Sequence, residues 1–190
     1  MNAEILSRLR TNPIIASVRN ETQLERALDS KSEIIFIINS DIKKVVNQAR
    51  KATETDKMVF VHVDVIYGFS SSPLALEYIC STVKIDGIIT TKKALVNKAR
   101  TLGIASVLRV FAVDSPTVRT SSGLANDIKP DLLEVLPGIA PKAIRYIKKQ
   151  TSIPVISGGF IETKEEIIDC IRAGAVGVST SSANLIIAKA

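Results

Sequence analysis

The sequence contains little of what metal, redox and base-stacking sites require. Its 190 residues include no tryptophan, and aromatic residues make up only 4%. Cys80 and Cys170 are the two cysteines, and they lie far apart in helical patterns. Isolated cysteines of this kind are mostly buried as small apolar residues, and no zinc or haem spacing occurs. We therefore expect no metal site and no disulfide, and the sequence shows no stacking platform for single-stranded bases.

Long apolar runs are also missing. No run reaches the ~18 residues that a membrane span requires. The first residues, MNAEILSRLR, lack the apolar core and cleavage site of a signal peptide. The sequence therefore predicts a cytoplasmic protein without a membrane partner. No linker or low-complexity tract divides the chain, so we expect residues 1–190 to form a single domain.

Eight short apolar runs rich in β-branched residues recur along the chain. They are continuous rather than alternating, which is typical of strands buried on both faces of a parallel sheet. Helical patterns separate them, with a Ser115–Pro116 start, a Thr163–Glu166 capping box and a terminating Gly174 as examples. The runs are 13–19, 33–39, 58–64, 87–90, 105–111, 132–137, 154–159 and 176–181.

Eight strand–helix units predict an α/β fold of the TIM type, a (β/α)8 barrel. Typical examples have about 250 residues. We therefore expect a short barrel with some helices brief or absent, either closed or incomplete. An open doubly wound sheet is the alternative. The segment after the first run, ASVRNETQ, lacks a glycine-rich dinucleotide loop, which counts against that alternative.

Charged residues lie at the C-terminal ends of the predicted strands, where barrels place their functional residues. Arg19, Asp64, Arg109 and Glu134 lie within or directly after apolar runs. We expect them to surround a ligand. The alternative is a buried ion-pair network that closes the top of the barrel, because structural networks occupy such places too.

Small residues end the last two runs. Gly158 and Gly159 end the seventh, and Ser179, Thr180 and Ser181 end the eighth. Barrels commonly bind phosphate at the loops after these strands, beside the start of a short helix. The glycines would let the backbone approach a ligand, and the hydroxyls would donate hydrogen bonds at the start of the helix ANLIIAKA. We predict a phosphate site here. The alternative is glycines that serve a turn and hydroxyls that cap the last helix.

Six segments carry a resemblance, in this order: NPIIASVRN, VFVHVDVIYGF, DGIITTKKALVNKAR, LRVFAVDS, DLLEVLPGIAPKAI and IPVISGGFIETKEEIIDCIRAGAVGVSTSS. Together they resemble the glycerol-3-phosphate-responsive antiterminators of glycerol uptake operons. The resemblance implies a regulator on a barrel-like fold. Such a regulator binds glycerol 3-phosphate as its effector and acts on a leader mRNA of glycerol-metabolism genes, so that transcription passes a terminator. It also implies that the strand-end residues named above, from Arg19 to Ser181, belong to the family's motifs.

Two positions depart from the family pattern. Tyr67 stands where a polar or charged residue is expected, and the loop INSDIKK lacks the glycine expected near Ser40. Both are predicted to lie at the ligand mouth, so they bear on the identity of the ligand more than on the fold.

The sequence gives only partial support for a basic surface that could bind RNA. The net charge is +6, and basic residues are concentrated in the predicted helices 41–54, 91–101 and 139–149, of which the last two contain no acid. Such helices could follow a phosphate backbone. The alternative is ordinary solvated helix faces. The candidate RNA contacts are Lys93, Arg100, Lys142, Arg145 and Lys149.

The second hypothesis is a phosphate-handling barrel enzyme of the isomerase, aldolase or synthase type. Asp64 and Glu134 could form an acid–base pair, and Lys92 could form a Schiff base. However, Lys92 precedes Lys93 in a predicted exposed helix start, and no predicted strand contains a lysine. His62 is expected to be a satisfied core histidine, with a contact to ligand or Asp64 as the alternative. We therefore favour a regulator without catalytic residues or cofactor, and leave a homo-oligomer open.

Overall fold

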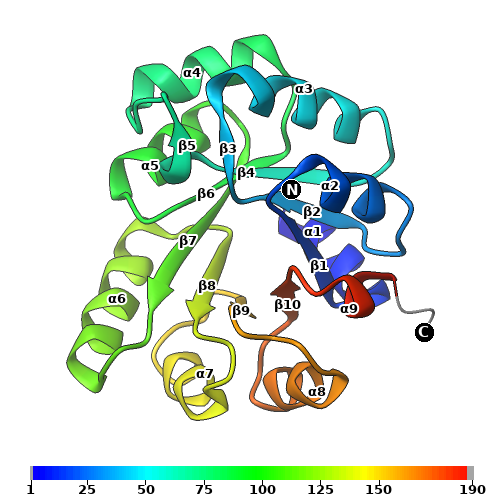
Figure 1. Cartoon of the computed structure of the whole chain (residues 1–190). Coiled ribbons are helices and arrows are strands. Elements are labelled where there is room, and N and C mark those ends of the chain that lie inside the picture. The colour runs from blue at the N-terminus through cyan, green and yellow to red at the C-terminus, as the bar shows by residue number, and fades with distance from the viewer. Residues whose placement is uncertain (1, 188–190) are drawn as a thin grey trace.

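The computed structural model describes residues 2–187, in which eight parallel strands form a closed barrel. Neighbouring strands in the chain are neighbours in the barrel, and β1 pairs with β10 to close it (Figure 1). The predicted TIM-type barrel is confirmed, in its closed form. The strands are β1 (Ile14–Val18), β2 (Ile34–Ile37), β4 (Met58–His62), β6 (Gly87–Thr90), β7 (Ala105–Phe111), β8 (Leu132–Leu136), β9 (Val155–Gly158) and β10 (Gly177–Thr180).

A helix follows every barrel strand, so the helices are brief rather than absent. The capping box of Thr163 and Glu166 is confirmed, and Gly174 follows the same helix at a φ of +106°. The prediction that Ser115 precedes its helix is wrong by one residue. Asp114 is the N-cap instead, because its carboxylate accepts a hydrogen bond of 2.8 Å from the N–H of Thr117. The helices are α1 (Asn2–Thr11), α2 (Glu21–Leu28), α3 (Ile42–Thr53), α4 (Pro73–Thr82), α5 (Lys93–Thr101), α6 (Ser115–Ile128), α7 (Pro141–Lys148), α8 (Lys164–Arg172) and α9 (Ala183–Ile187).

The barrel interior is apolar at one end and polar at the other. Helix α1, which the sequence analysis did not predict, packs Ile5 and Leu9 into the interior cluster that contains Phe36 and Phe60. A Cβ added to Gly177, the first residue of β10, would lie 2.7 Å from the side chain of Leu9. Helix α1 therefore covers the N-terminal ends of the strands, and only the C-terminal ends are left to form a ligand mouth.

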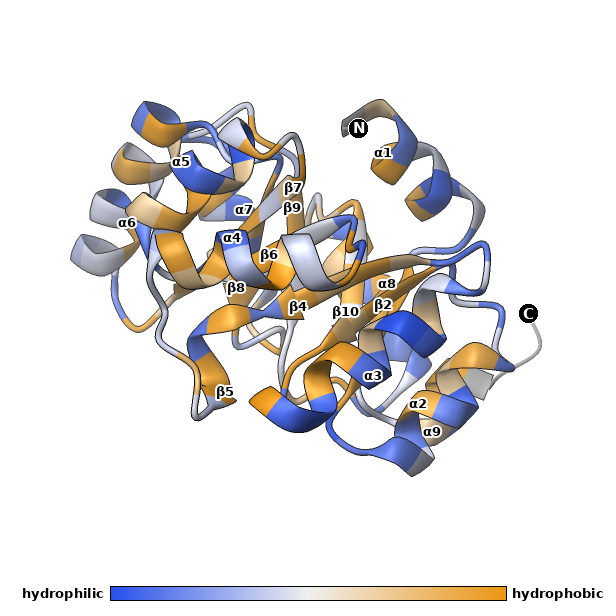
Figure 2. Ribbon diagram, turned by 90° about the horizontal axis from the view of Figure 1, so that it is seen from above, coloured by the Kyte–Doolittle hydropathy of each residue, from blue (hydrophilic) through white to orange (hydrophobic). Residues whose placement is uncertain are grey.

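Apolar residues also fill the space between the strands and the surrounding helices. Two clusters of buried residues lie there, one under α2 to α5 and one under α6 to α8. The strands are largely hydrophobic, whereas the helices alternate between hydrophobic and hydrophilic residues (Figure 2). Each fully buried aliphatic side chain contributes about 1.5–3 kcal/mol to folding, so the barrel can hold polar groups at its mouth. No helix within residues 2–187 is long and apolar enough to cross a membrane.

A second, two-stranded sheet lies beside the mouth and was not predicted. β3 (Ser40–Asp41) pairs in parallel with β5 (Ile66–Tyr67). The register places Ser40 opposite Ile66 and Asp41 opposite Tyr67. The two segments that depart from the family pattern therefore pair directly with each other.

Candidate functional site

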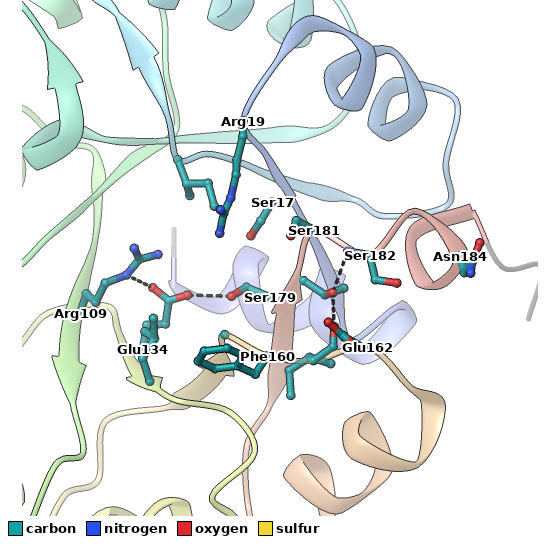
Figure 3. Close-up of a pocket in the computed structure, with 15 residues that line it drawn as sticks. Ser17, Arg19, Arg109, Glu134, Phe160, Glu162, Ser179, Ser181, Ser182 and Asn184 are labelled. Carbon is teal, nitrogen blue, oxygen red and sulfur yellow. Dashed lines mark hydrogen bonds and ion pairs between the residues drawn. The ribbon is translucent and has the colours of Figure 1, made fainter.

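A cavity of about 800 Å³ opens at the C-terminal ends of β1, β7, β8, β9 and β10. Its volume lies within the roughly 300–1,000 Å³ that is usual for small-molecule sites. Figure 3 shows polar side chains from several strands arranged around it. The lining residues are Ser17, Arg19, Ile38, Arg109, Glu134, Leu136, Gly159, Phe160, Ile161, Glu162, Ser179, Thr180, Ser181, Ser182 and Asn184.

Glu134 is the centre of the cavity floor and is fully buried, with 0% of its surface exposed. The parallel register of β7 and β8 places Arg109 beside it. The Arg109 Nε donates to one carboxylate oxygen at 2.7 Å, and the Ser179 Oγ donates to the other at 2.7 Å. The Arg109 side chain is only 13% exposed. A charge as buried as that of Glu134 requires such partners, because an unpaired buried carboxylate is strongly destabilising. Predicted residues from three strands thus form one network.

Gly158 makes this network sterically possible and does not itself line the cavity. A Cβ at Gly158 would lie 2.1 Å from the Ser179 Oγ and 3.0 Å from the Glu134 Oε1. The prediction that Gly158 lets the backbone approach a ligand therefore needs correction, since the groups that fill its space are Ser179 and Glu134. Gly159 does line the cavity, at a φ of +83° that favours glycine.

The hydroxyls after β10 divide into two kinds. Thr180 Oγ1 donates to the carbonyl oxygen of Ile161 at 2.7 Å and accepts from the N–H of Ser182 at 3.0 Å. Its proton is thus used within the protein, and the prediction of Thr180 as a ligand donor is not supported. The hydroxyls of Ser181 and Ser182 line the cavity beside Asn184, and none of these three side chains has a hydrogen-bond partner among residues 2–187.

Arg19 supplies the cavity with a cation that no carboxylate of the described residues pairs with. It directly follows β1, and its side chain points into the cavity from the side opposite Glu134 (Figure 3). Gln23 accepts the backbone N–H of Arg19 at 2.8 Å, which fixes the turn into α2. Glu162 brings a second carboxylate to the rim. The free positive charge of Arg19 therefore faces a floor whose own charges are paired.

Asp64 is not part of this cavity. The chain leaves β4 at His62 and turns into a 3₁₀ helix (Val63–Val65), so that Asp64 points toward the end of β6. Its carboxylate accepts hydrogen bonds of 2.7–2.8 Å from Thr90 Oγ1 and from the N–H and Oγ1 of Thr91. The structure therefore gives no support to the predicted ligand role of Asp64 or to its pairing with Glu134 as acid and base, because its carboxylate instead holds the β6–α5 loop.

His62 is a buried core residue, as predicted, but it is not fully hydrogen-bonded. Its Nδ1 has no hydrogen-bond partner in the described part of the chain. Burial in the first place, and the nearby Arg109 guanidinium in the second, lower the pKa of His62 to about 4. The imidazole is therefore neutral at physiological pH, and its uncharged state limits repulsion with Arg109.

A smaller cavity of about 420 Å³ lies next to the first and shares Arg19 with it. Ser40 and Tyr67 line it, so the two departures from the family pattern contribute to the same space. The Ser40 hydroxyl donates to Gln48 at 2.6 Å, and Asp41 caps α3. Tyr67 is highly exposed. The prediction that these positions border the mouth is consistent with this placement.

The basic helices differ in how much of their charge is free. Lys51 on α3 forms ion pairs with Glu21 and Glu25, and Lys98 on α5 pairs with Glu77 at 2.7 Å. These acids come from neighbouring helices, which the segment-by-segment charge count could not reveal. Of the predicted RNA contacts, Arg100 donates to the carbonyls of Ile128 and Lys129 at the end of α6, whereas Lys93 is exposed. Lys142, Arg145 and Lys149 are exposed on or directly after α7 and form no ion pair among residues 2–187.

Several lining residues were missed by sequence reasoning: Ser17, Phe160, Glu162 and Asn184. Ser17 had a usable signal, because it is the only polar residue that precedes Arg19 in the first apolar run and lies two positions before it, on the same face of the predicted strand. Phe160 adopts a φ of +60°, which is uncommon for a residue with a side chain. No sequence pattern indicates that conformation.

A sequence profile of the family described as "Glycerol-3-phosphate responsive antiterminator" matches residues 14–186 of this chain. The chain belongs to this family. It is also 32% identical over 178 residues to the uncharacterized protein YgcP of Escherichia coli strain K12, covering 94% of this chain and 93% of the relative. The family assignment made from the sequence motifs is thus confirmed.

Two solved structures with family-related names are similar in fold. The glycerol uptake operon antiterminator regulatory protein of Listeria monocytogenes strain 4b F2365 matches with a TM-score of 0.86 and 29% identity, covering 90% of this chain and 92% of the other. A glycerol uptake operon antiterminator-related protein of Thermotoga maritima MSB8 matches with a TM-score of 0.80 and 31% identity, covering 90% and 96%. The family barrel therefore extends over nearly the whole chain.

Proposed function

We propose that this protein is a transcription antiterminator that binds glycerol 3-phosphate and acts on the leader mRNA of glycerol-metabolism genes in the cytoplasm. The observation that carries the proposal is the cavity at the ends of β9 and β10, where Arg19 faces the hydroxyls of Ser181 and Ser182, all three side chains without a partner within residues 2–187. Family membership supports the regulatory part of the proposal. Glycerol 3-phosphate is here an effector and not a cofactor.

The two ends of the ligand would meet different halves of the cavity. A phosphate dianion needs cations and hydrogen-bond donors, and Arg19, Ser181 and Ser182 offer both on one side. The glycerol hydroxyls need partners that both accept and donate. The Glu134 carboxylate accepts, and the remaining guanidinium N–H groups of Arg109 donate. Repulsion between the phosphate and the Glu134 carboxylate would keep the phosphate away from the floor and set the orientation.

A regulatory role fits this chemistry better than an enzymatic one. No lysine lines the cavity among the described residues, and Lys92 is exposed and contacts the carbonyl of Ser71. Glu134 is held between Arg109 and Ser179, and Asp64 points elsewhere. The cavity thus provides groups that bind and orient a phosphomonoester rather than groups that move a proton.

Thermal melts with millimolar glycerol 3-phosphate, glycerol or inorganic phosphate test the ligand. A ligand at 100 times its dissociation constant stabilises the folded state by about 2.7 kcal/mol. We expect glycerol 3-phosphate to raise the melting temperature clearly more than either of its parts. An equal shift with inorganic phosphate would reduce the cavity to a general anion site, and no shift would contradict the proposal.

A gel shift with the leader RNA of a glycerol-metabolism gene tests the regulatory role. Ligand can switch the protein only if it binds the RNA-competent state better than the other state. We therefore expect glycerol 3-phosphate to tighten RNA binding. If the RNA affinity is the same with and without glycerol 3-phosphate, and the protein turns over a sugar phosphate, the enzyme hypothesis is favoured instead.

A further inference from the structure

The outer face of α7 combines an exposed aromatic ring with basic residues that form no ion pair in the described part of the chain. Lys142, Arg145, Tyr146 and Lys149 have the spacing i, i+3, i+4 and i+7, which places them on one side of a helix. Side chains opposite this face, Ile144 and Ile147, are buried against the barrel. Tyr146 is 38% exposed. We call these four residues the α7 face.

The neighbouring helix α6 fixes the position of the ring. Arg119 Nη1 donates a hydrogen bond of 3.2 Å to the Tyr146 hydroxyl. This contact ties the Tyr146 hydroxyl to a guanidinium of α6, and the basic residues of α7 lie on the same helix face as the ring. The hydroxyl is bound at one edge, and the exposed part of the ring remains available to a flat partner.

Of the two exposed tyrosines that lie on helices, Tyr78 and Tyr146, only Tyr146 shares its helix face with basic residues that form no ion pair among residues 2–187. On α4, Tyr78 is more exposed, at 60%, but its neighbour Glu77 is the acid that pairs with Lys98. On the other side of the α7 face, the first turn of α8 contains Glu165 and Glu166 after Lys164, and Glu166 is occupied in the capping box. An acidic helix therefore borders the α7 face, which favours a path for a polyanion toward α6 and away from α8.

We propose that single-stranded RNA crosses the α7 face, with one base stacked on Tyr146 and phosphates paired with Lys142, Arg145 and Lys149. This inference rests on the proposed function, because it names where the RNA binds. Unpaired bases stack on aromatic side chains and on guanidinium planes, and cations follow the backbone. Lys142 and Lys149 lie about 10 Å apart along the helix axis, so the row is long enough to contact more than one nucleotide. This proposal differs from the sequence analysis, which showed no stacking platform.

The chain offers a direct optical test, because it contains no tryptophan. Tyr146→Trp introduces a single tryptophan at the proposed stacking position, and Tyr78→Trp is the matched control on α4. We expect short single-stranded RNA of mixed sequence to quench the fluorescence of Tyr146→Trp strongly and that of Tyr78→Trp hardly at all. Equal quenching of both, or quenching by heparin and double-stranded RNA to the same extent, would overturn the stacking proposal.

Binding measurements separate stacking from charge. Tyr146→Ala should weaken binding of glycerol 3-phosphate-loaded protein to leader RNA by about five- to a hundredfold, with an unchanged salt slope. Reversing Lys142, Arg145 and Lys149 to Glu should abolish RNA binding but retain the ligand-induced melting shift. Single reversals should flatten the slope of log affinity against log salt by about 0.7 each.

Two outcomes distinguish the failure of this inference from the failure of the proposed function. If Tyr146→Ala and the triple reversal bind leader RNA like the wild type, the α7 face is not the RNA-binding surface, while the ligand-responsive RNA-binding function stands. If the wild-type protein binds no RNA with or without glycerol 3-phosphate, the proposed function itself is contradicted, and the α7 face with it.

Discussion

Replacing Gly158 with alanine measures how tightly the cavity floor is packed. The new Cβ would lie 2.1 Å from the Ser179 Oγ and 3.0 Å from the Glu134 Oε1, so Ser179 must turn away and release the carboxylate. Overpacking a core costs about 1–3 kcal/mol, and a lost hydrogen bond to a charged group costs about 1.5–3 kcal/mol. Because turning Ser179 away relieves part of the strain, the two terms overlap, and we expect a loss of roughly 2–4 kcal/mol in the free energy of unfolding.

Urea unfolding of four variants tests this reasoning: Gly158→Ala, Gly123→Ala, Ser179→Ala and the double variant Gly158→Ala/Ser179→Ala. Gly123→Ala is the matched control, because Gly123 lies within α6 and a Cβ there meets nothing within 4 Å. That change should stabilise the protein by about 0.5–1 kcal/mol. Adding Ser179→Ala to Gly158→Ala removes the colliding oxygen, so the double variant should lose less than the sum of the two single losses. A loss below about 1 kcal/mol for Gly158→Ala, or strict additivity in the double variant, would refute the packing account.

Two further predictions concern the floor and its surroundings. Arg109→Lys keeps the charge but loses the planar fork, so we expect a folded protein whose melting shift with glycerol 3-phosphate is clearly reduced; an undiminished shift would make Arg109 structural only. The pKa of His62 is lowered to about 4 from an ordinary value of 6.5, so the folded state binds this proton less readily than the unfolded state. The corresponding stability is complete above pH 6.5 and declines as the pH falls toward 4, by about 3 kcal/mol in total. Urea unfolding across that range should show a flatter pH dependence for His62→Gln than for the wild type, and parallel curves would contradict this origin.

The strands could be predicted from the sequence because their burial on both faces leaves an unambiguous apolar pattern. The same pattern located the residues at the strand ends, and with them Arg19, Arg109 and Glu134. The chain order of the strands in the barrel then followed from the strand–helix alternation. The sequence pattern alone thus limits the candidate residues of the ligand mouth to a few side chains.

The direction of those side chains could not be predicted. Asp64 follows its strand by two residues, and a 3₁₀ turn that leaves no sequence pattern directs it to Thr90 and Thr91. Thr180 is indistinguishable in sequence from Ser181, yet it is committed to the carbonyl of Ile161 by contact with the preceding loop. Likewise, the acids that neutralise Lys51 and Lys98 come from other helices. Contacts between segments far apart in the chain decide each of these cases.

Barrel closure has a consequence for how the protein is made. β1 pairs with β2 on one edge and with β10, the last barrel strand, on the other. The second edge can pair only after β10 has been synthesised. Ribosomes add about 5–20 residues per second, so the stretch from Val18 to Gly177 takes on the order of ten seconds to synthesise, and β1 has an unpaired edge throughout. Such edges pair readily with other chains, and contacts between distant segments form slowly. We therefore expect the edge of β1 to stay open to pairing with other chains until the final strand is made.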